Sequence, residues 1–260
     1  MGSAAITLCR RGVAMLRRPF ASSRWQELYR RIREQLSLDE RADREAAELL
    51  AGLARQRRSP LEELLRAIRG REVVVAGAGN TLEQGLELLA GRLLKAPLVA
   101  ADGAVSPLLA KGLRPLLVVT DLDGPHAALY DAYQRGAQLA VHAHGDNMPQ
   151  LMSFVPRLSS FLGTAQVEPA PPPLVNPYGF TDGDRAAYLA YALGARAIYL
   201  IGMELKEPPG VHSSMGRRSP AEVSTRLSIA RELLSLLAQA GARLYSLGPP
   251  PAPGIRKMAI

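Results

Sequence analysis

The chain has 260 residues, of which 47% are hydrophobic and 22% are charged. This balance supplies enough apolar side chain for a substantial core, so it excludes a mainly disordered chain and fits one large domain with at most a small appendage. The formal net charge is +8, and the single cysteine, Cys9, excludes a disulfide framework and a thiolate metal cluster. We therefore expect a protein of the reducing cytoplasm.

The positive charge is concentrated at the start of the chain. Residues 1–24 contain five arginines and no acidic residue, so the remainder is nearly balanced. Aromatic residues make up 5% of the chain and do not alternate with basic ones, which argues against nucleic-acid binding. No apolar run approaches the roughly 20 residues that span a bilayer, so no membrane association is expected. We treat residues 1–20 as an extension outside the fold, with Met15 as an alternative start.

Apolar residues recur at helical spacing between residues 25 and 69. Ser37 or Asp39 can cap the second of the predicted helices, and Ser59-Pro60 is typical of the start of a third. Together with the extension, residues 1–70 are predicted to form an N-terminal helical subdomain. The two apolar stripes consist of Trp25, Leu28, Tyr29 and Ile32, and of Ala46, Leu49, Leu50 and Leu53.

Short, continuously apolar runs alternate with helical stretches from residue 71 onward. Runs of this kind are typical of strands that are buried on both faces, and the helices between them indicate βαβ units. We predict an α/β domain over residues 71–260: an open, mostly parallel, doubly wound sheet with helices on both faces. The predicted strands are 73–76, 97–101, 116–120, 139–142, 197–201 and a weaker 243–246, with 161–167 as a further candidate.

Polar residues follow these runs, at the strand ends where ligands bind in parallel sheets. Gly77, Gly79 and Asn80 follow the first run and can bring backbone N–H groups close to an anion. Position 82 is Leu, so the dinucleotide-binding pattern is incomplete, and the lysine of a P-loop is absent. A plain turn from strand to helix is the alternative.

Two aspartates, Asp121 and Asp123, follow the third run and precede a glycine. Magnesium binds one or two carboxylates together with phosphate oxygens and water, which this pair can provide. A turn that caps a helix is the alternative. Asp102, which follows the second run, is predicted to lie at the same edge of the sheet.

The segment 142–147 contains His142, His144, Asp146 and Asn147. The spacing is similar to that of the metal motif of metallo-β-lactamase-like hydrolases, but that motif ends in a histidine where this chain has Asn147. Zinc hydrolysis is therefore a minor alternative, and His142 can equally be a hydrogen-bonded core residue.

Residues 181–185 combine a helix cap, two carboxylates and a guanidinium group. A simple N-cap is the alternative role for Asp182. Arg185 suits either bidentate contact with phosphate or an ion pair with Asp182. Asp184 adds a further carboxylate to the predicted edge.

In this order, the segments resemble the archaeal type of 6-hydroxymethyl-7,8-dihydropterin pyrophosphokinase, whose catalytic domain is similar to that of thiamin pyrophosphokinases. The resemblance extends from about residue 25 to residue 237. It rests on the helical preface, on residues 76–79, 102–103, 120–124, 142–147 and 179–185, and on Gly202-Met203.

The resemblance implies magnesium-dependent transfer of diphosphate from ATP to the pterin's hydroxymethyl oxygen, with release of AMP. It implies that Asp121 and Asp123 hold magnesium, and that Asp146 or Asp184 is a further ligand or orients the nucleophile. Arg185 would contact phosphate. The residues expected to bind nucleotide, pterin or metal-bound water are Gly77, Gly79, Asn80, Asp102, Asn147 and Asp182.

The expected partners are small molecules, ATP and the dihydropterin alcohol, with a homodimer as the assembly to test. Four positions depart from the family pattern: Asn80-Thr81 replaces Pro-Ser, Glu204 replaces an aspartate, and Ser224 replaces a lysine. A metal-dependent nucleotide-sugar glycosyltransferase and a non-catalytic nucleotide-binding relative remain as alternatives. Folate and methanopterin pathways are both open.

Overall fold

The structure is a computed structural model and describes residues 15–89, 91–214 and 218–258. Cys9 and most of the predicted N-terminal extension lie outside the described residues. Among those that are described, no helix is both long and apolar enough to cross a bilayer.

Three helices precede the sheet, as the apolar spacing predicts: α2 (Ser22–Leu36), α3 (Glu40–Ala54) and α4 (Leu61–Ile68). Asp39 is the residue that caps α3, since its carboxylate accepts the backbone N–H of Arg41 at 2.8 Å. Ser37 instead ends α2 in a left-handed conformation, with φ of 53°. Each helix therefore starts or stops where the local polar residue permits.

Eight parallel strands form one open sheet in the order β5-β4-β3-β2-β1-β6-β7-β8. The predicted strands are confirmed, including the extra candidate, which is β5. A short β8 at the edge was not predicted. The strands are β1 (Glu72–Ala76), β2 (Leu98–Ala101), β3 (Leu117–Thr120), β4 (Gln138–Ala143), β5 (Leu162–Ala165), β6 (Ala197–Ile201), β7 (Leu244–Ser246) and β8 (Arg256–Lys257).

The strand order reverses at β1, which fixes the place of the site. From β1 the chain adds β2 to β5 on one side and then returns to add β6 on the other, so β1 pairs with both β2 and β6. The connections that leave β1 and β2 therefore diverge from the connection that leaves β6. A crevice opens at the carboxyl ends of these strands, where ligands bind in doubly wound sheets.

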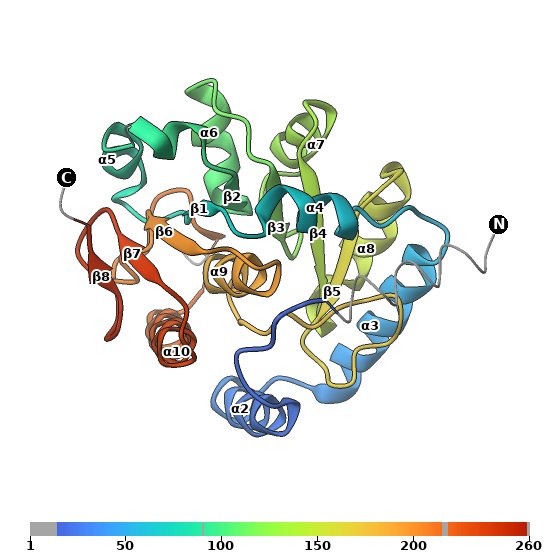
Figure 1. The fold of residues 1–260 in the computed structure, drawn as a ribbon. Helices are drawn as coiled ribbons and strands as arrows, with labels where there is room; N and C mark the ends of the chain where they lie inside the picture. The colour runs from blue at the N-terminus through green and yellow to red at the C-terminus, as the bar shows by residue number, and fades with distance from the viewer. Residues whose placement is uncertain (1–14, 90, 215–217, 259–260) are drawn as a thin grey trace.

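Helices cover both faces of the sheet, so the doubly wound prediction is confirmed. Figure 1 shows α6 and α7 on one side and α9 and α10 on the other. The helix α9 packs against β1, β2, β3 and β6, and α10 packs against α9 and α2. The helices after β1 are α5 (Leu82–Glu87), α6 (Val105–Ala110), α7 (His126–Gln134), α8 (Met148–Phe154), α9 (Asp182–Ala192) and α10 (Pro220–Gln239).

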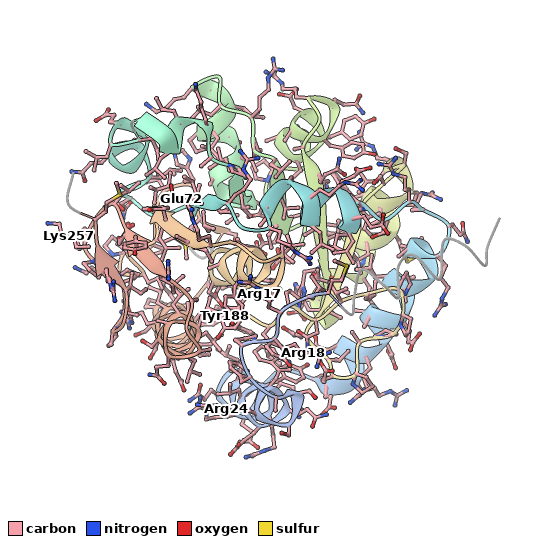
Figure 2. The ribbon with its side chains drawn as sticks, viewed as in Figure 1. Arg17, Arg18, Arg24, Glu72, Tyr188 and Lys257 are labelled. Carbon is pink, nitrogen blue, oxygen red and sulfur yellow. The ribbon has the colours of Figure 1, made fainter. Side chains whose placement is uncertain are left out.

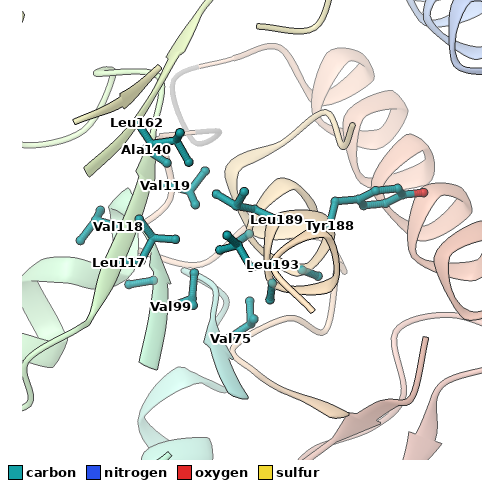
Figure 3. Packing of buried hydrophobic residues seen from close by; sticks show 14 of the residues in the cluster. Val75, Val99, Leu117, Val118, Val119, Ala140, Leu162, Tyr188, Leu189 and Leu193 are labelled. Carbon is teal, nitrogen blue, oxygen red and sulfur yellow. The ribbon is translucent and has the colours of Figure 1, made fainter. Parts of the chain in front are cut away.

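The core is centred on the contact between α9 and the sheet. Leu189 and Leu193 point toward the strand residues Val75, Val99 and Val119 (Figure 3), and all five side chains are fully buried. Because α9 is buried around most of its circumference, its first turn is held firmly against the carboxyl ends of the strands.

The N-terminal helices share this core. Trp25 belongs to the same cluster of buried residues as the strands, and its indole N–H donates to the carbonyl of Gln166 at 2.8 Å. The predicted boundary near residue 70 stays a prediction, and it cuts through one continuous apolar cluster.

Part of the segment that we set outside the fold packs onto it. Phe20 stacks on Tyr178 with ring centroids 5.1 Å apart, and the Arg17 N–H donates to the carbonyl of Ala192 at 2.9 Å. The Phe20 ring also packs edge-on against Tyr188 with centroids 6.4 Å apart, and Figure 2 labels Tyr188 together with Arg17 and Arg18 in one part of the view. An Arg-rich composition alone therefore misplaced the start of the fold by a few residues.

Candidate active site

Four aspartates meet at the crevice beside the reversal of strand order. Asp102 follows β2, Asp121 and Asp123 follow β3, and Asp182 begins α9. One carboxylate oxygen from each lies within 4.8 Å of those of the other three. We call these four residues the carboxylate cluster. Hard divalent cations prefer oxygen ligands of this kind, and in the described part of the chain this is the group whose spacing suits one.

A strained turn aims the two aspartates of β3 into the cluster. Leu122 has φ of 66°, which is rare for a branched residue, and its side chain is buried. Its N–H donates to the hydroxyl of Thr120 at 2.8 Å, and the N–H of Asp123 donates to Oδ1 of Asp121 at 3.1 Å. Because these bonds fix the turn, both carboxylates lie close enough to share one cation.

The carboxylates of the cluster repel one another, so the cluster is favoured by additional positive charge. Burial, followed by the charges of Asp121 and Asp123, raises the pKa of Asp102 to about 7. Burial and the charges of Asp121 and Asp102 likewise raise the pKa of Asp182 well above its usual value. A divalent cation would offset this repulsion, so the residues present fit a metal site.

Asp121 differs because His144 and Arg185 lie close to it. Burial raises its pKa, but the hydrogen bond from His144 and the charge of Arg185 outweigh burial and hold the pKa below the usual range. Nε2 of His144 lies 3.4 Å from Oδ2 of Asp121. Asp121 thus stays ionised more readily than Asp102 or Asp182.

Arg185 is buried beneath the cluster rather than directed into the open crevice. Its guanidinium group pairs with Asp182 at 3.2 Å and donates to the carbonyl of Phe180 at 2.6 Å. Of the two contacts that the sequence suggested, the ion pair is therefore the one present. The guanidinium group orients Asp182 and supplies positive charge near Asp121.

Asp184 lies outside the carboxylate cluster, contrary to the expectation that it is a further ligand. Its carboxylate accepts the backbone N–H groups of Phe180 at 2.6 Å and of Thr181 at 2.8 Å, and the Thr181 hydroxyl also donates to it. These bonds form the capping box of α9. Asp184 thereby holds the loop that presents Asp182.

Asp146 and Asn147 are also separated from the cluster. The side chain of Asp146 is 79% exposed, whereas Asn147 is buried and donates to the carbonyls of Asp121 at 2.6 Å and His142 at 2.8 Å. Asn147 therefore ties the end of β3 to the end of β4. The geometry supports a positioning role for Asn147 and gives Asp146 no contact with the crevice.

His142 is a core residue, as its alternative interpretation predicts. It is buried, its Nδ1 lies 3.0 Å from the hydroxyl of Thr164, and burial together with Arg185 lowers its pKa well below the usual value. The carboxylate cluster contains no histidine among the described residues. This arrangement does not favour zinc hydrolysis, because imidazole ligands do not converge on the site.

Gly77 and Gly79 line the crevice, but their N–H groups are already used. The N–H of Gly77 donates to Ile201 and that of Gly79 donates to Gly202, at 2.9 and 2.8 Å. The two glycines instead allow the segment after β1 to lie close to the segment after β6, since a Cβ on Gly77 would lie 2.4 Å from Sδ of Met203. Asn80 is exposed and donates to Pro208 at 3.1 Å.

Two departures from the family pattern contact each other. The hydroxyl of Thr81 donates to Oε2 of Glu204 at 2.6 Å, and the Thr81 N–H donates to Oε1 at 3.3 Å. The longer acidic side chain thus binds the start of α5 in place of an anion. The residues at the two departing positions, Thr81 and Glu204, therefore form a direct hydrogen-bonded contact.

The crevice is open to solvent. Besides the carboxylate cluster and the glycines, three cations line it that sequence analysis did not assign: Lys206, Arg218 and Arg226. Lys206 follows β6 by five residues, whereas Arg218 and Arg226 lie far from the strand ends in sequence. The only available signal was the departure from a family pattern next to Arg226.

The chain is similar in sequence to known proteins. The model of the family described as 6-hydroxymethylpterin diphosphokinase, MptE-like, matches residues 47–209. The 6-hydroxymethyl-7,8-dihydropterin pyrophosphokinase of Pyrococcus furiosus is 41% identical, over 84% of this chain and 94% of its own. Proteins with the same name from Methanothermobacter thermautotrophicus and Methanocaldococcus jannaschii are 36% and 34% identical, over 84% and 69% of this chain and 95% and 78% of theirs.

The fold is also similar to that of a solved structure. The MAf glycosyltransferase from Magnetospirillum magneticum AMB-1 matches 82% of this chain with a TM-score of 0.51 and 17% sequence identity. This chain spans 38% of the length of that protein. At this identity the likeness concerns the fold alone.

Proposed function

Because this chain belongs to the MptE-like family of 6-hydroxymethylpterin diphosphokinases, we propose that it transfers diphosphate from ATP to 6-hydroxymethyl-7,8-dihydropterin. The hydroxymethyl oxygen bonds to the β-phosphorus of ATP. The bond from that phosphorus to the oxygen bridging the α-phosphate breaks, AMP leaves with that oxygen, and the hydroxyl proton passes to solvent. The products are the pterin diphosphate and AMP.

The carboxylate cluster is the observation that supports this proposal most directly. We assign Asp121 and Asp123 as the principal ligands of Mg²⁺, with Asp102 and Asp182 completing the oxygen ligands. The cation, when bound, neutralises phosphate charge and makes the β-phosphorus more electrophilic. Phosphoryl transfer depends mostly on such positioning and charge neutralisation, so a single well-held cation site is the central requirement.

The residues around the cluster position it. Arg185 orients Asp182, Asp184 holds the loop that carries Asp182, and Asn147 braces the end of β3. We assign the crevice beside the cluster, where Gly77 and Gly79 form one wall, as the binding site of ATP and the pterin. In this assignment Asp184 and Asn147 act through other residues rather than on the substrates.

The test is a coupled measurement of AMP release. Purified protein is incubated with Mg²⁺, ATP and the dihydropterin alcohol, and both AMP and the pterin diphosphate are quantified. We expect equal amounts of the two products, and none without the pterin. Thiamin in place of the pterin tests the nearest alternative acceptor. An absence of pterin diphosphate above background would overturn the proposal.

A further inference from the structure

Two arginines outside the sheet lie on the same crevice as the carboxylate cluster. Arg218 precedes the first turn of α10 and Arg226 lies two turns along it. Nη1 of Arg218 and Nε of Arg226 both donate to Oε1 of Glu222, each at 2.9 Å. One carboxylate oxygen therefore holds two guanidinium groups side by side. We call Arg218 and Arg226 the arginine pair.

Each arginine is further constrained by a residue of the crevice wall. Nη2 of Arg218 lies 3.8 Å from Oδ2 of Asp123, and the guanidinium carbon of Arg226 lies 5.2 Å from the centre of the Phe180 ring. Their side chains are 27% and 13% exposed, so both are largely desolvated. Burial, followed by the charge of Arg218, lowers the pKa of Arg226. The arginine pair therefore contacts two carboxylates, Glu222 on α10 and Asp123 in the carboxylate cluster.

A ligand with several negative charges would complete this arrangement. Three positive features meet there. They are the two guanidinium groups and the amino-terminal end of the 20-residue helix α10, where the helix dipole places partial positive charge. Guanidinium groups bind phosphate oxygens with directed, charge-assisted hydrogen bonds. A cation held by Asp123 would bind oxygens of the same phosphate chain, because Arg218 lies directly beside that carboxylate.

We infer that the arginine pair binds the β- and γ-phosphates of the nucleotide, which fixes the polyphosphate chain between α10 and the carboxylate cluster. This inference rests on the proposed function for the identity of the nucleotide. Glu222 is a positioning residue, since it touches both arginines and sets their spacing. The γ-phosphate end of the nucleotide therefore lies toward α10.

The test compares ATP with AMP, which has the base, ribose and α-phosphate but not the two outer phosphates. Dissociation constants are measured by calorimetry with Mg²⁺ for the wild type, Arg226→Ala, Arg226→Lys and Arg218→Ala. We expect each alanine variant to weaken ATP binding by about 10-fold or more and AMP binding by less than about 3-fold. Arg226→Lys should retain part of the ATP affinity because it keeps the charge.

The control is Arg135→Ala, which removes an arginine from a similar pair, at 2.8 Å from Asp131 on α7, that does not line the crevice. It should leave both affinities unchanged. Equal losses for ATP and AMP, or no loss for ATP, would overturn the inference. If Arg226→Ala does not fold, as judged by its thermal transition, Arg218→Ala decides the question.

The outcomes also separate this inference from the proposed function. A wild type that binds ATP, loses that affinity selectively in the arginine variants and yet forms no pterin diphosphate would support the arginine pair and overturn only the function. If the wild type forms pterin diphosphate and the arginine variants bind ATP with unchanged affinity, the proposed function is supported and the inference about the arginine pair is overturned. A wild type that binds no nucleotide would overturn both.

Discussion

The backbone N–H of Gly145 donates a hydrogen bond of 2.7 Å to Oδ1 of Asp43, and this bond joins α3 to the loop after β4. The other oxygen of Asp43 accepts the hydroxyl of Tyr29 and, at 2.8 Å, the amide of Gln166. Asp43 is buried, so these three donors supply the hydrogen bonds that water would otherwise give to its carboxylate. His144 precedes Gly145 and contacts Asp121. The bond from Gly145 to Asp43 therefore connects α3 to a residue that positions the carboxylate cluster.

Replacing Asp43 by Ala should destabilise the protein and weaken cation binding. Three buried donors lose their acceptor, so we expect the free energy of unfolding to fall by about 3 kcal/mol or more. Urea unfolding measures the fall, and calorimetry measures Mg²⁺ affinity. Asp131→Ala, which removes an exposed pair with Arg135, should change stability by less than about 1 kcal/mol. Similar effects of the two substitutions would contradict the buried role of Asp43.

Replacing Asp123 by Ala should abolish turnover while preserving the fold. Loss of a cation ligand removes several kcal/mol of transition-state stabilisation, which corresponds to a rate at least about 1,000-fold lower. The thermal transition of the metal-free protein should stay the same or rise, because one of the repelling charges is gone. A large drop in the transition temperature would instead indicate that Asp123 mainly stabilises the turn.

The stability of the metal-free protein should depend on the ionisation of Asp102. Its pKa is raised to about 7, so between about pH 4 and pH 7 the folded state binds a proton that the unfolded state has lost. The contribution of Asp102 to stability therefore falls as the pH rises through this range, by about 1.4 kcal/mol per pH unit. Below about pH 4 both states are protonated and the effect vanishes.

The variant Asp102→Asn isolates this contribution. In the presence of a chelator it should be more stable than the wild type at pH 8, and the difference should shrink as the pH is lowered toward 4. Saturating Mg²⁺ should reverse the order at pH 8, because the wild type then gains binding energy. Urea unfolding at each pH provides the measurement. A wild type that gains stability relative to the variant as the pH rises without metal would refute the assignment.

Adding a methyl group at Gly77 should disturb the wall of the crevice. The new Cβ would meet Sδ of Met203 at 2.4 Å and the carbonyl oxygen of Gly202 at 2.6 Å, so β1 and β6 must separate at their ends. We expect Gly77→Ala to lower the free energy of unfolding by about 1–3 kcal/mol and to weaken ATP binding.

A matched substitution in α3 provides the control. A Cβ on Gly52 meets nothing within 4 Å, and this residue lies inside a helix. Gly52→Ala should therefore raise the free energy of unfolding by about 0.5–1 kcal/mol and leave ATP binding unchanged. A Gly77→Ala variant that behaves like Gly52→Ala would show that the close approach is not required.

The sequence by itself determined the elements and the edge of the sheet that carries the polar residues. Buried parallel strands are continuous apolar runs, so β1 to β4 and β6 were visible as runs that end in or just before Gly, Asp or His. The rule that ligands bind at carboxyl ends then selected Asp102, Asp121 and Asp123 together. These signals are local or follow from strand direction, which is why they survive without knowledge of the packing.

Only the tertiary structure decided which of the candidate side chains face the crevice. Asp182 and Asp184 are two residues apart on one helix, yet one joins the carboxylate cluster and the other caps the helix. The arginine pair enters the crevice from α10, a helix that follows the predicted strand ends by many residues. Side-chain direction and long-range approach depend on how the helices pack on the sheet, and no local sequence pattern encodes that packing.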